Sequence, residues 1–64
     1  MDGTARKFIR PGVAVEIVLK KDQRSGKLTR GVVGDVLTKS ARHPHGIKVL
    51  LKGGQVGRVK KIVG

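Results

Sequence analysis

The side chains best suited to chemistry in this sequence are cationic. Its 64 residues contain 15 Lys and Arg against four Asp and Glu, a formal net charge of +11. Such an excess on a short chain is typical of a protein that meets a polyanion. Most of the candidates lie in two segments, residues 20–30 and 39–45. The residues predicted to bind the phosphates of a nucleic acid are Lys20, Lys21, Arg24, Lys27, Arg30, Lys39, Arg42, His43, His45 and Arg58.

Two histidines flank Pro44 in the second segment. Their side chains point to opposite sides of an extended backbone unless the chain turns at Pro44. Because there is no cysteine and there are few carboxylates to complete a coordination sphere, we expect no metal site. RNA cleavage would need one histidine as base and the other as acid, with Lys39 or Lys48 on the phosphate, in a pocket that is hard to build here. The simplest interpretation is a loop whose histidines cap a strand or pack on the end of the fold.

The near absence of aromatic residues narrows the choice of partner. Phe8 is the one residue of the Phe, Tyr and Trp class. One ring cannot supply the stacking platforms of single-strand binders, so contacts with phosphates of structured RNA or a duplex are expected. The aromatic grooves that bind proline-rich peptides and the cages that bind methyl-lysine are excluded for the same reason. A merely solvated basic surface is the alternative to a binding surface.

Hydrophobic periodicity predicts short strands. Residues 13–19 alternate with a period of two, and residues 27–38 form the central strand, where a bulge near Gly34 and Asp35 lets Val33 and Val36 both face inward. Residues 47–52 alternate again, and Gly53 and Gly54 predict a two-residue hairpin into a strand at 56–59. Residues 60–63 are predicted to form a last strand or a 3₁₀ turn, with Ile62 inside.

These elements favour an all-β fold, a small SH3-like barrel of about five antiparallel strands. An OB-like barrel is the alternative, although it normally needs a fifth full strand and often a helix. Sixty-four residues make one domain with a thin core of Val, Ile and Leu. We place a flexible N-terminal tail at residues 1–7 and the barrel at residues 8–64.

Several runs of residues carry a family resemblance. The runs 20–31 (KKDQRSGKLTRG), 37–40 (LTKS), 43–49 (HPHGIKV) and 54–59 (GQVGRV) resemble the YwbE-like family of small uncharacterised bacterial and archaeal proteins. This resemblance covers nearly the whole chain and implies no activity. A looser pattern, the Pro11-Gly12 turn, the basic loop and residues 31–36 (GVVGDV), is similar to translation-type SH3-like modules such as the KOW motif and certain large-subunit ribosomal proteins. That likeness favours RNA without identifying a partner.

Together these features predict a non-enzymatic, RNA-binding accessory protein, with the ribosome as a candidate setting. A protein-interaction adaptor that binds an acidic partner or adds a strand at a sheet edge is the alternative, and a small ribonuclease using His43 and His45 is the third. We expect a monomer without cofactor. No long apolar run or signal-peptide pattern points to a membrane, and the lack of cysteine suits a cytoplasmic protein.

Overall fold

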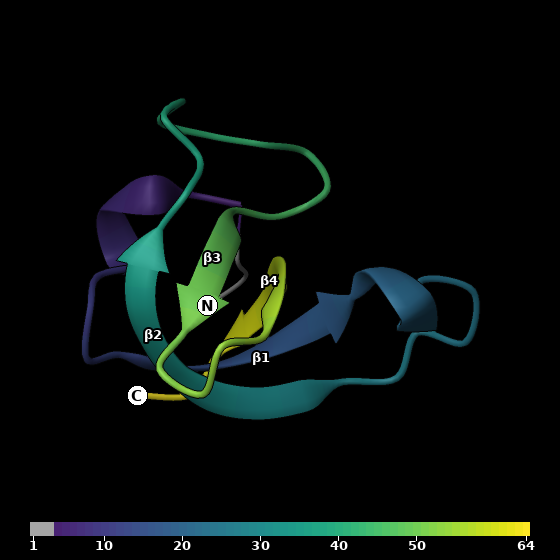
Figure 1. Cartoon of the computed structure of the whole chain (residues 1–64). Helices are drawn as coiled ribbons and strands as arrows, with labels where there is room; N and C mark the ends of the chain where they lie inside the picture. The colour runs from purple at the N-terminus through teal and green to yellow at the C-terminus, as the bar shows by residue number, and fades with distance from the viewer. Residues whose placement is uncertain (1–3) are drawn as a thin grey trace.

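Four strands follow one another along the chain in the computed structural model, which describes residues 4–64 (Figure 1). They are β1 (Ala14–Leu19), β2 (Thr29–Val36), β3 (Lys48–Leu51) and β4 (Val56–Ile62), with two 3₁₀ helices, η1 (Arg6–Phe8) before β1 and η2 (Lys20–Asp22) after it. Each strand pairs antiparallel with the next, and β4 pairs back with β1. The sheet is therefore a closed barrel, as the prediction of a small SH3-like barrel requires.

The core is built from the inward residues of every strand. Val15 and Ile17 in β1 are fully buried, whereas Glu16 between them is half-buried on the outer face. Among residues 4–64, the buried residues that cluster in the core are Ile9, Val15, Ile17, Val33, Ile47, Val49, Leu51 and Val59. Because β-branched side chains fill the inside, the alternate positions of the strands are free to carry charge on the outside.

Two irregularities interrupt the strand pairing. The register of β2 against β3 shifts between Val33 and Asp35, and Val33 is buried while Val36 packs against the core, which confirms the predicted bulge. A second shift lies between β1 and β4, where Ile17 pairs with Val59 and Glu16 with Lys61. Lys60 is the extra residue there. Such a bulge leaves two consecutive lysines between inward-facing residues of β4.

Two details of the predicted strands are wrong. The barrel has four strands rather than five, because residues 60–62 continue β4 without a break. The β3–β4 hairpin has a three-residue loop rather than a two-residue one: the Gly54 N–H donates to the Leu51 carbonyl at 2.9 Å, and the Leu51 N–H donates to the Gln55 carbonyl at 2.8 Å. Gly54 has φ +95°, so a tight turn followed by a left-handed glycine closes the hairpin.

The N-terminal segment also differs from the prediction of a tail up to Lys7. Residues 1–3 lie outside the described residues. From Thr4 onward the backbone runs along the second basic loop: the His43 N–H donates to the Thr4 carbonyl at 3.0 Å and the Arg6 N–H to the Ala41 carbonyl at 2.8 Å, with a bridge between Ala5 and Arg42. These hydrogen bonds tie residues 4–6 to the barrel.

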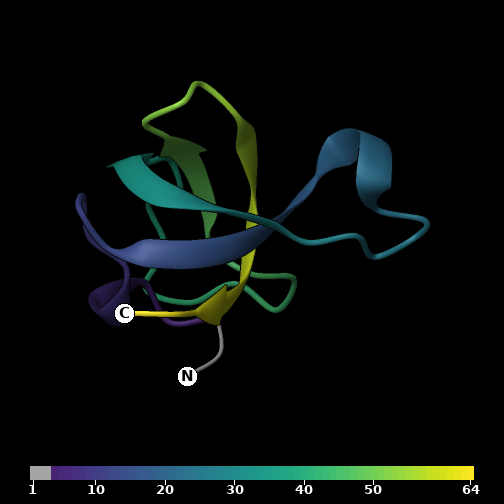
Figure 2. The ribbon, with the colours of Figure 1, turned by 90° about the horizontal axis from the view of Figure 1, so that it is seen from below.

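The two basic loops leave opposite ends of β2. The loop before it, residues 20–28, extends away from the barrel in both ribbon views, and the loop after it, residues 37–47, crosses one end of the barrel (Figures 1 and 2). Both loops reach the outer face of β4, the strand between β1 and β3 in the closed sheet. That face is where the site is built.

Candidate functional site

The outer face of β4 carries a row of cations across three strands. Gly57 and Val59 are buried, so Val56, Arg58 and Lys60 lie on the outside. Arg58 pairs with Val18 of β1 on one side and with Lys48 of β3 on the other. Side chains opposite one another in an antiparallel sheet have Cβ atoms about 5 Å apart, so the charges of Arg58 and Lys48 are neighbours.

The loop of residues 20–28 forms one wall beside this row. Its turn is held by the Gly26 N–H, which donates to the Asp22 carbonyl at 2.8 Å, and by the Ser25 hydroxyl, which donates to the same carbonyl at 3.2 Å. This turn brings Lys20 and Gln23 to the edge of the sheet, over Val18, which is buried although it faces outward.

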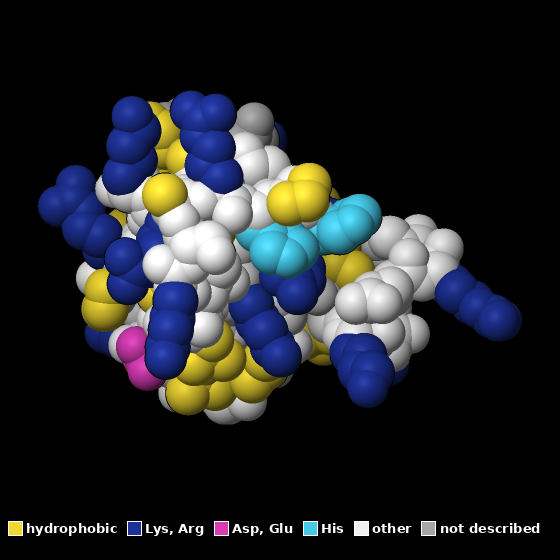
Figure 3. Space-filling model, turned by 90° about the horizontal axis from the view of Figure 1, so that it is seen from above, with side chains coloured by type: hydrophobic (Ala, Val, Ile, Leu, Met, Phe, Trp, Pro, Cys, Tyr) yellow, Lys and Arg dark blue, Asp and Glu magenta, His cyan; other side chains and the backbone are white. Residues whose placement is uncertain are grey.

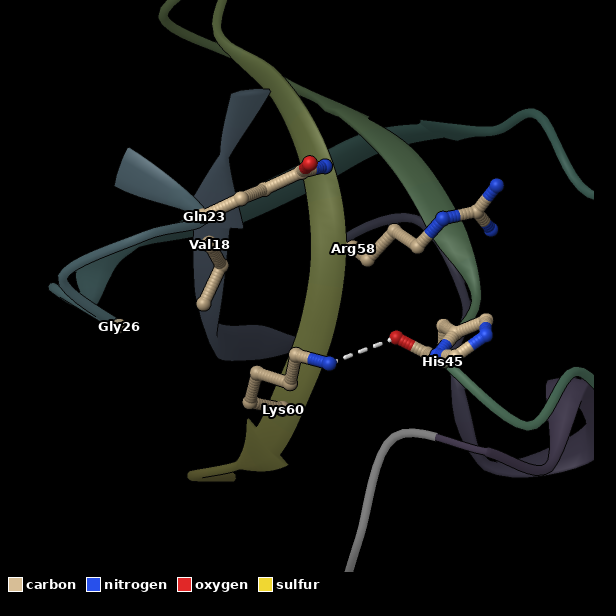
Figure 4. Close-up of a pocket in the computed structure, with 6 residues that line it drawn as sticks. All are labelled: Val18, Gln23, Gly26, His45, Arg58 and Lys60. Atoms are coloured by element: carbon tan, nitrogen blue, oxygen red, sulfur yellow. Dashed lines mark hydrogen bonds between the residues drawn. The ribbon is translucent and has the colours of Figure 1, made fainter. Parts of the chain in front are cut away.

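Two adjoining hollows lie between the loop and the sheet. The larger, of about 430 Å³, is lined by Val18, Gln23, Gly26, His45, Arg58 and Lys60 (Figure 4). The smaller, of about 210 Å³, shares Val18, Gln23 and Arg58 with it and adds Lys20 and Lys48. We call the two together the basic groove; its polar side chains are Lys20, Gln23, His45, Lys48, Arg58 and Lys60. No Asp or Glu of residues 4–64 lines it.

Two of these cations hold the second loop against β4. The Arg58 guanidinium donates from Nη1 to the Gly46 carbonyl at 3.0 Å, and the Lys60 ammonium donates to the His45 carbonyl at 2.8 Å (Figure 4). Gly46 is required there, because its φ is +101° and a Cβ would collide with the carbonyl oxygen of Val59. The loop is thus fixed, while most guanidinium and ammonium donors stay available to a ligand.

The chain does turn at Pro44, and the turn brings the histidines together. The Gly46 N–H donates to the His43 carbonyl at 3.0 Å, and the two imidazole centroids are 5.8 Å apart. The His45 N–H donates to Nδ1 of His43 at 3.2 Å, which requires that nitrogen to be unprotonated. Burial lowers the pKa of His43 below its ordinary value of 6.5, and the charges of Arg58 and His45 lower it further. His43 is therefore neutral at pH 7, beside the groove.

The predicted binding residues divide into two sets. Lys20, His45 and Arg58 line the basic groove, and His43 adjoins it through His45. The others lie outside both hollows. Arg30 is on the outer face of β2, where Nη2 is 3.8 Å from Oε2 of Glu16. The exposed remainder consists of Lys21, Arg24 and Lys27 on the first loop and Lys39 and Arg42 on the second.

Three residues that line the groove, Gln23, Lys48 and Lys60, are not among those predicted from the sequence. Lys48 was detectable, because it lies between the apolar residues Ile47 and Val49, which face the core, and so must point outward. Lys60 was not, because it is followed by Lys61 and its side depends on the second bulge. Gln23 carries no such signal, since its position depends on the turn of a loop. A third hollow, of about 430 Å³ beside η1, gathers Arg6, Lys7 and Arg10 but also Asp35, which offsets part of their charge.

Seen from the end that the second loop crosses, Lys and Arg side chains surround the two histidines on several sides, and acidic side chains are sparse (Figure 3). Among residues 4–64, no three of His, Cys, Asp and Glu gather closely enough to hold a metal ion. No helix within the same residues is long and apolar enough to cross a membrane.

Comparison with known proteins adds the family but no activity. A model of the family described as "Uncharacterized conserved protein (DUF2196)" matches residues 2–62. "Uncharacterized protein YwbE" from Bacillus subtilis (strain 168) is 59% identical over 63 residues, which are 98% of this chain and 97% of that protein. No solved structure matches the chain. A match of this extent confirms the resemblance to the YwbE-like family: the chain belongs to the DUF2196 family.

Proposed function

We propose that this protein is a non-enzymatic RNA-binding protein that contacts the phosphates of structured RNA through the basic groove. The observation that supports this most directly is the convergence of Lys20, Lys48, Arg58 and Lys60, from η2, β3 and β4, on two adjoining hollows. Neutralising phosphates and releasing their counterions supplies much of the affinity of such proteins. A pair of linked hollows suits successive phosphates of one strand better than it suits one small anion.

The setting of this function is part of the proposal. The likeness of residues 11–12 and 31–36 to translation-type SH3-like modules favours RNA, and the ribosome is a candidate site of action. A chain without cysteine suits the cytoplasm, where thiols do not form a disulfide framework. We expect the protein to act as a monomer.

The two alternative functions receive less support. Every described strand has a hydrogen-bonded neighbour on both sides, which weighs against an adaptor that adds a strand at a sheet edge. An acidic protein on the groove remains the competing partner. For RNA cleavage, Nδ1 of His43 is already occupied by the His45 N–H, which leaves only Nε2 for catalysis.

The proposal is tested with the double variant Lys48→Glu/Lys60→Glu and the matched control Lys52→Glu/Lys61→Glu, which changes the net charge equally. Lys52 in the β3–β4 hairpin and Lys61 in β4 are exposed lysines outside both hollows. Binding to a structured RNA hairpin is measured by fluorescence anisotropy across a series of salt concentrations. If about four phosphates are contacted, log K falls with log salt at a slope of roughly −3 to −4 for the wild type.

We expect the double variant to bind much more weakly and with a slope flatter by about two units, one for each lost contact. The control keeps nearly the wild-type slope. Absence of RNA binding at low salt, with retained capture of an acidic protein, would favour the adaptor instead. Equal losses in the control and the double variant would show that the groove is not the site.

A further inference from the structure

The larger hollow has walls that phosphate binding does not explain. Besides Arg58 and Lys60 it is lined by Val18, Gln23, Gly26 and His45. Its volume of about 430 Å³ lies in the range of sites for small organic ligands. A phosphate group needs only positive charge and hydrogen-bond donors, so the apolar side chain of Val18 and the acceptor of the Gln23 amide favour a ligand that has an apolar, hydrogen-bonding part.

Three of the other lining residues match parts of a nucleobase. Val18 is 6% exposed and offers an apolar floor. His45 is exposed at the rim of the hollow, where its carbonyl faces Lys60 and its ring lies on the side away from Lys60 (Figure 4), and imidazole and guanidinium planes both stack on unpaired bases. The side-chain amide of Gln23 makes no hydrogen bond within residues 4–64 and has donors and an acceptor to offer to a base edge.

The arrangement around the hollow fits the rest of a nucleotide. In Figure 4 the Gln23 side chain extends from the loop across β4, while the Lys60 ammonium turns toward the His45 carbonyl on the second loop. Arg58 belongs to both hollows, and the smaller one adds the charges of Lys20 and Lys48. A base in the larger hollow would therefore have its neighbouring phosphates beside four cations.

We propose that the larger hollow binds one unpaired nucleotide of a structured RNA, with the base over Val18 beside Gln23 and His45. This inference rests on the proposed RNA binding and specifies which RNA is preferred: one with a bulged, looped or terminal base. It also modifies the expectation that a chain with a single phenylalanine contacts phosphates and not bases. A series of bases needs several aromatic platforms, but one splayed base needs one site.

The test compares two RNA hairpins that differ only in a single bulged nucleotide. Binding is measured by fluorescence anisotropy at one fixed salt concentration, so that the phosphate contribution is matched. Because base contacts of this kind are strong, we expect the bulged hairpin to bind at least about tenfold tighter than the fully paired one. Gln23→Ala and His45→Ala, each tested separately, lower the affinity for the bulged hairpin more than the affinity for the paired one, so that this ratio falls toward one.

The matched control is Gln55→Ala, which removes an exposed glutamine from the hairpin outside the hollow and keeps the preference. In ¹⁵N NMR spectra, the side-chain amide signals of Gln23 shift on addition of the bulged hairpin, whereas those of Gln55 do not. Equal binding of both hairpins by the wild type would overturn the nucleotide site and leave phosphate binding standing. A preference that survives both variants would also overturn it, and no binding of either hairpin would overturn the proposed function itself.

Discussion

His43 is held in its neutral form by its surroundings. Its Nδ1 accepts a hydrogen bond from the backbone N–H of His45, and burial, together with the charges of Arg58 and His45, lowers its pKa. The backbone N–H of His43 donates to the Thr4 carbonyl of the N-terminal segment, which fixes the position of the residue. Protonation of Nδ1 would break its hydrogen bond with the His45 N–H and would place a positive charge close to those of Arg58 and His45. The folded protein therefore resists a proton that the unfolded chain accepts.

This resistance predicts a pH dependence of stability. Because the pKa of His43 is lower in the folded state than its ordinary 6.5, its contribution is fully present above pH 6.5 and is lost as the pH falls toward the folded-state pKa. Urea unfolding between pH 7.5 and 5 should show falling stability for the wild type and a flatter profile for His43→Gln. Identical profiles would mean that His43 titrates normally.

Gly46 is a second single residue on which the second loop depends. A side chain there meets a positive φ and the Val59 carbonyl oxygen at once. We expect Gly46→Ala to lower the free energy of unfolding by more than about 1 kcal/mol, measured by urea denaturation. Gly64→Ala is the control, because a Cβ at that position meets nothing within 4 Å. A wild-type midpoint for Gly46→Ala would show that the loop can move away from β4.

Among the elements, β4 contributes both to the closure of the barrel and to the basic groove. Its inward residues close the barrel between β1 and β3, and its outward residues supply Arg58 and Lys60 to the groove. Period-two alternation predicted β1 and β3, where Lys48 lies between the buried Ile47 and Val49. The second bulge and the length of the hairpin loop depend on how strands meet in three dimensions, so the sequence pattern did not reveal them.

The long basic loop carries predicted binding residues that lie outside the groove. Arg24 and Lys27 were predicted to bind phosphates because of their type and position, but neither lines a hollow. We therefore expect Arg24→Glu/Lys27→Glu to weaken RNA binding less than Lys48→Glu/Lys60→Glu, although both variants change the charge equally. Anisotropy titrations at low salt make the comparison, and the reverse order would move the site onto the loop.

For the whole molecule, repulsion among the many Lys and Arg side chains opposes the stability of the folded state. A net charge of +11 is confined to a body of 27 × 24 × 19 Å with a core of eight residues. Composition predicted this thin core and the excess charge correctly. It did not predict which cations would meet, because their convergence requires the turn of one loop, the attachment of another and the register of three strands.

Self-repulsion of this size should make thermal stability depend on ionic strength. We expect the melting temperature to rise by about 4–8 °C, equivalent to about 1 kcal/mol, between low and moderate sodium chloride. Lys48→Glu/Lys60→Glu, with a smaller net charge, gains less. Circular dichroism melts provide the measurement, and a melting temperature independent of salt would show that the charges are too far apart to matter.

Closure of the sheet has a consequence for the assemblies this protein enters. No described strand offers an open ladder on which a second copy could polymerise, and like charge keeps separate copies apart in solution. Any particle that contains many copies should therefore be organised by its anionic scaffold, with copy number set by scaffold length, and it should fall apart into single subunits once a nuclease has digested that scaffold.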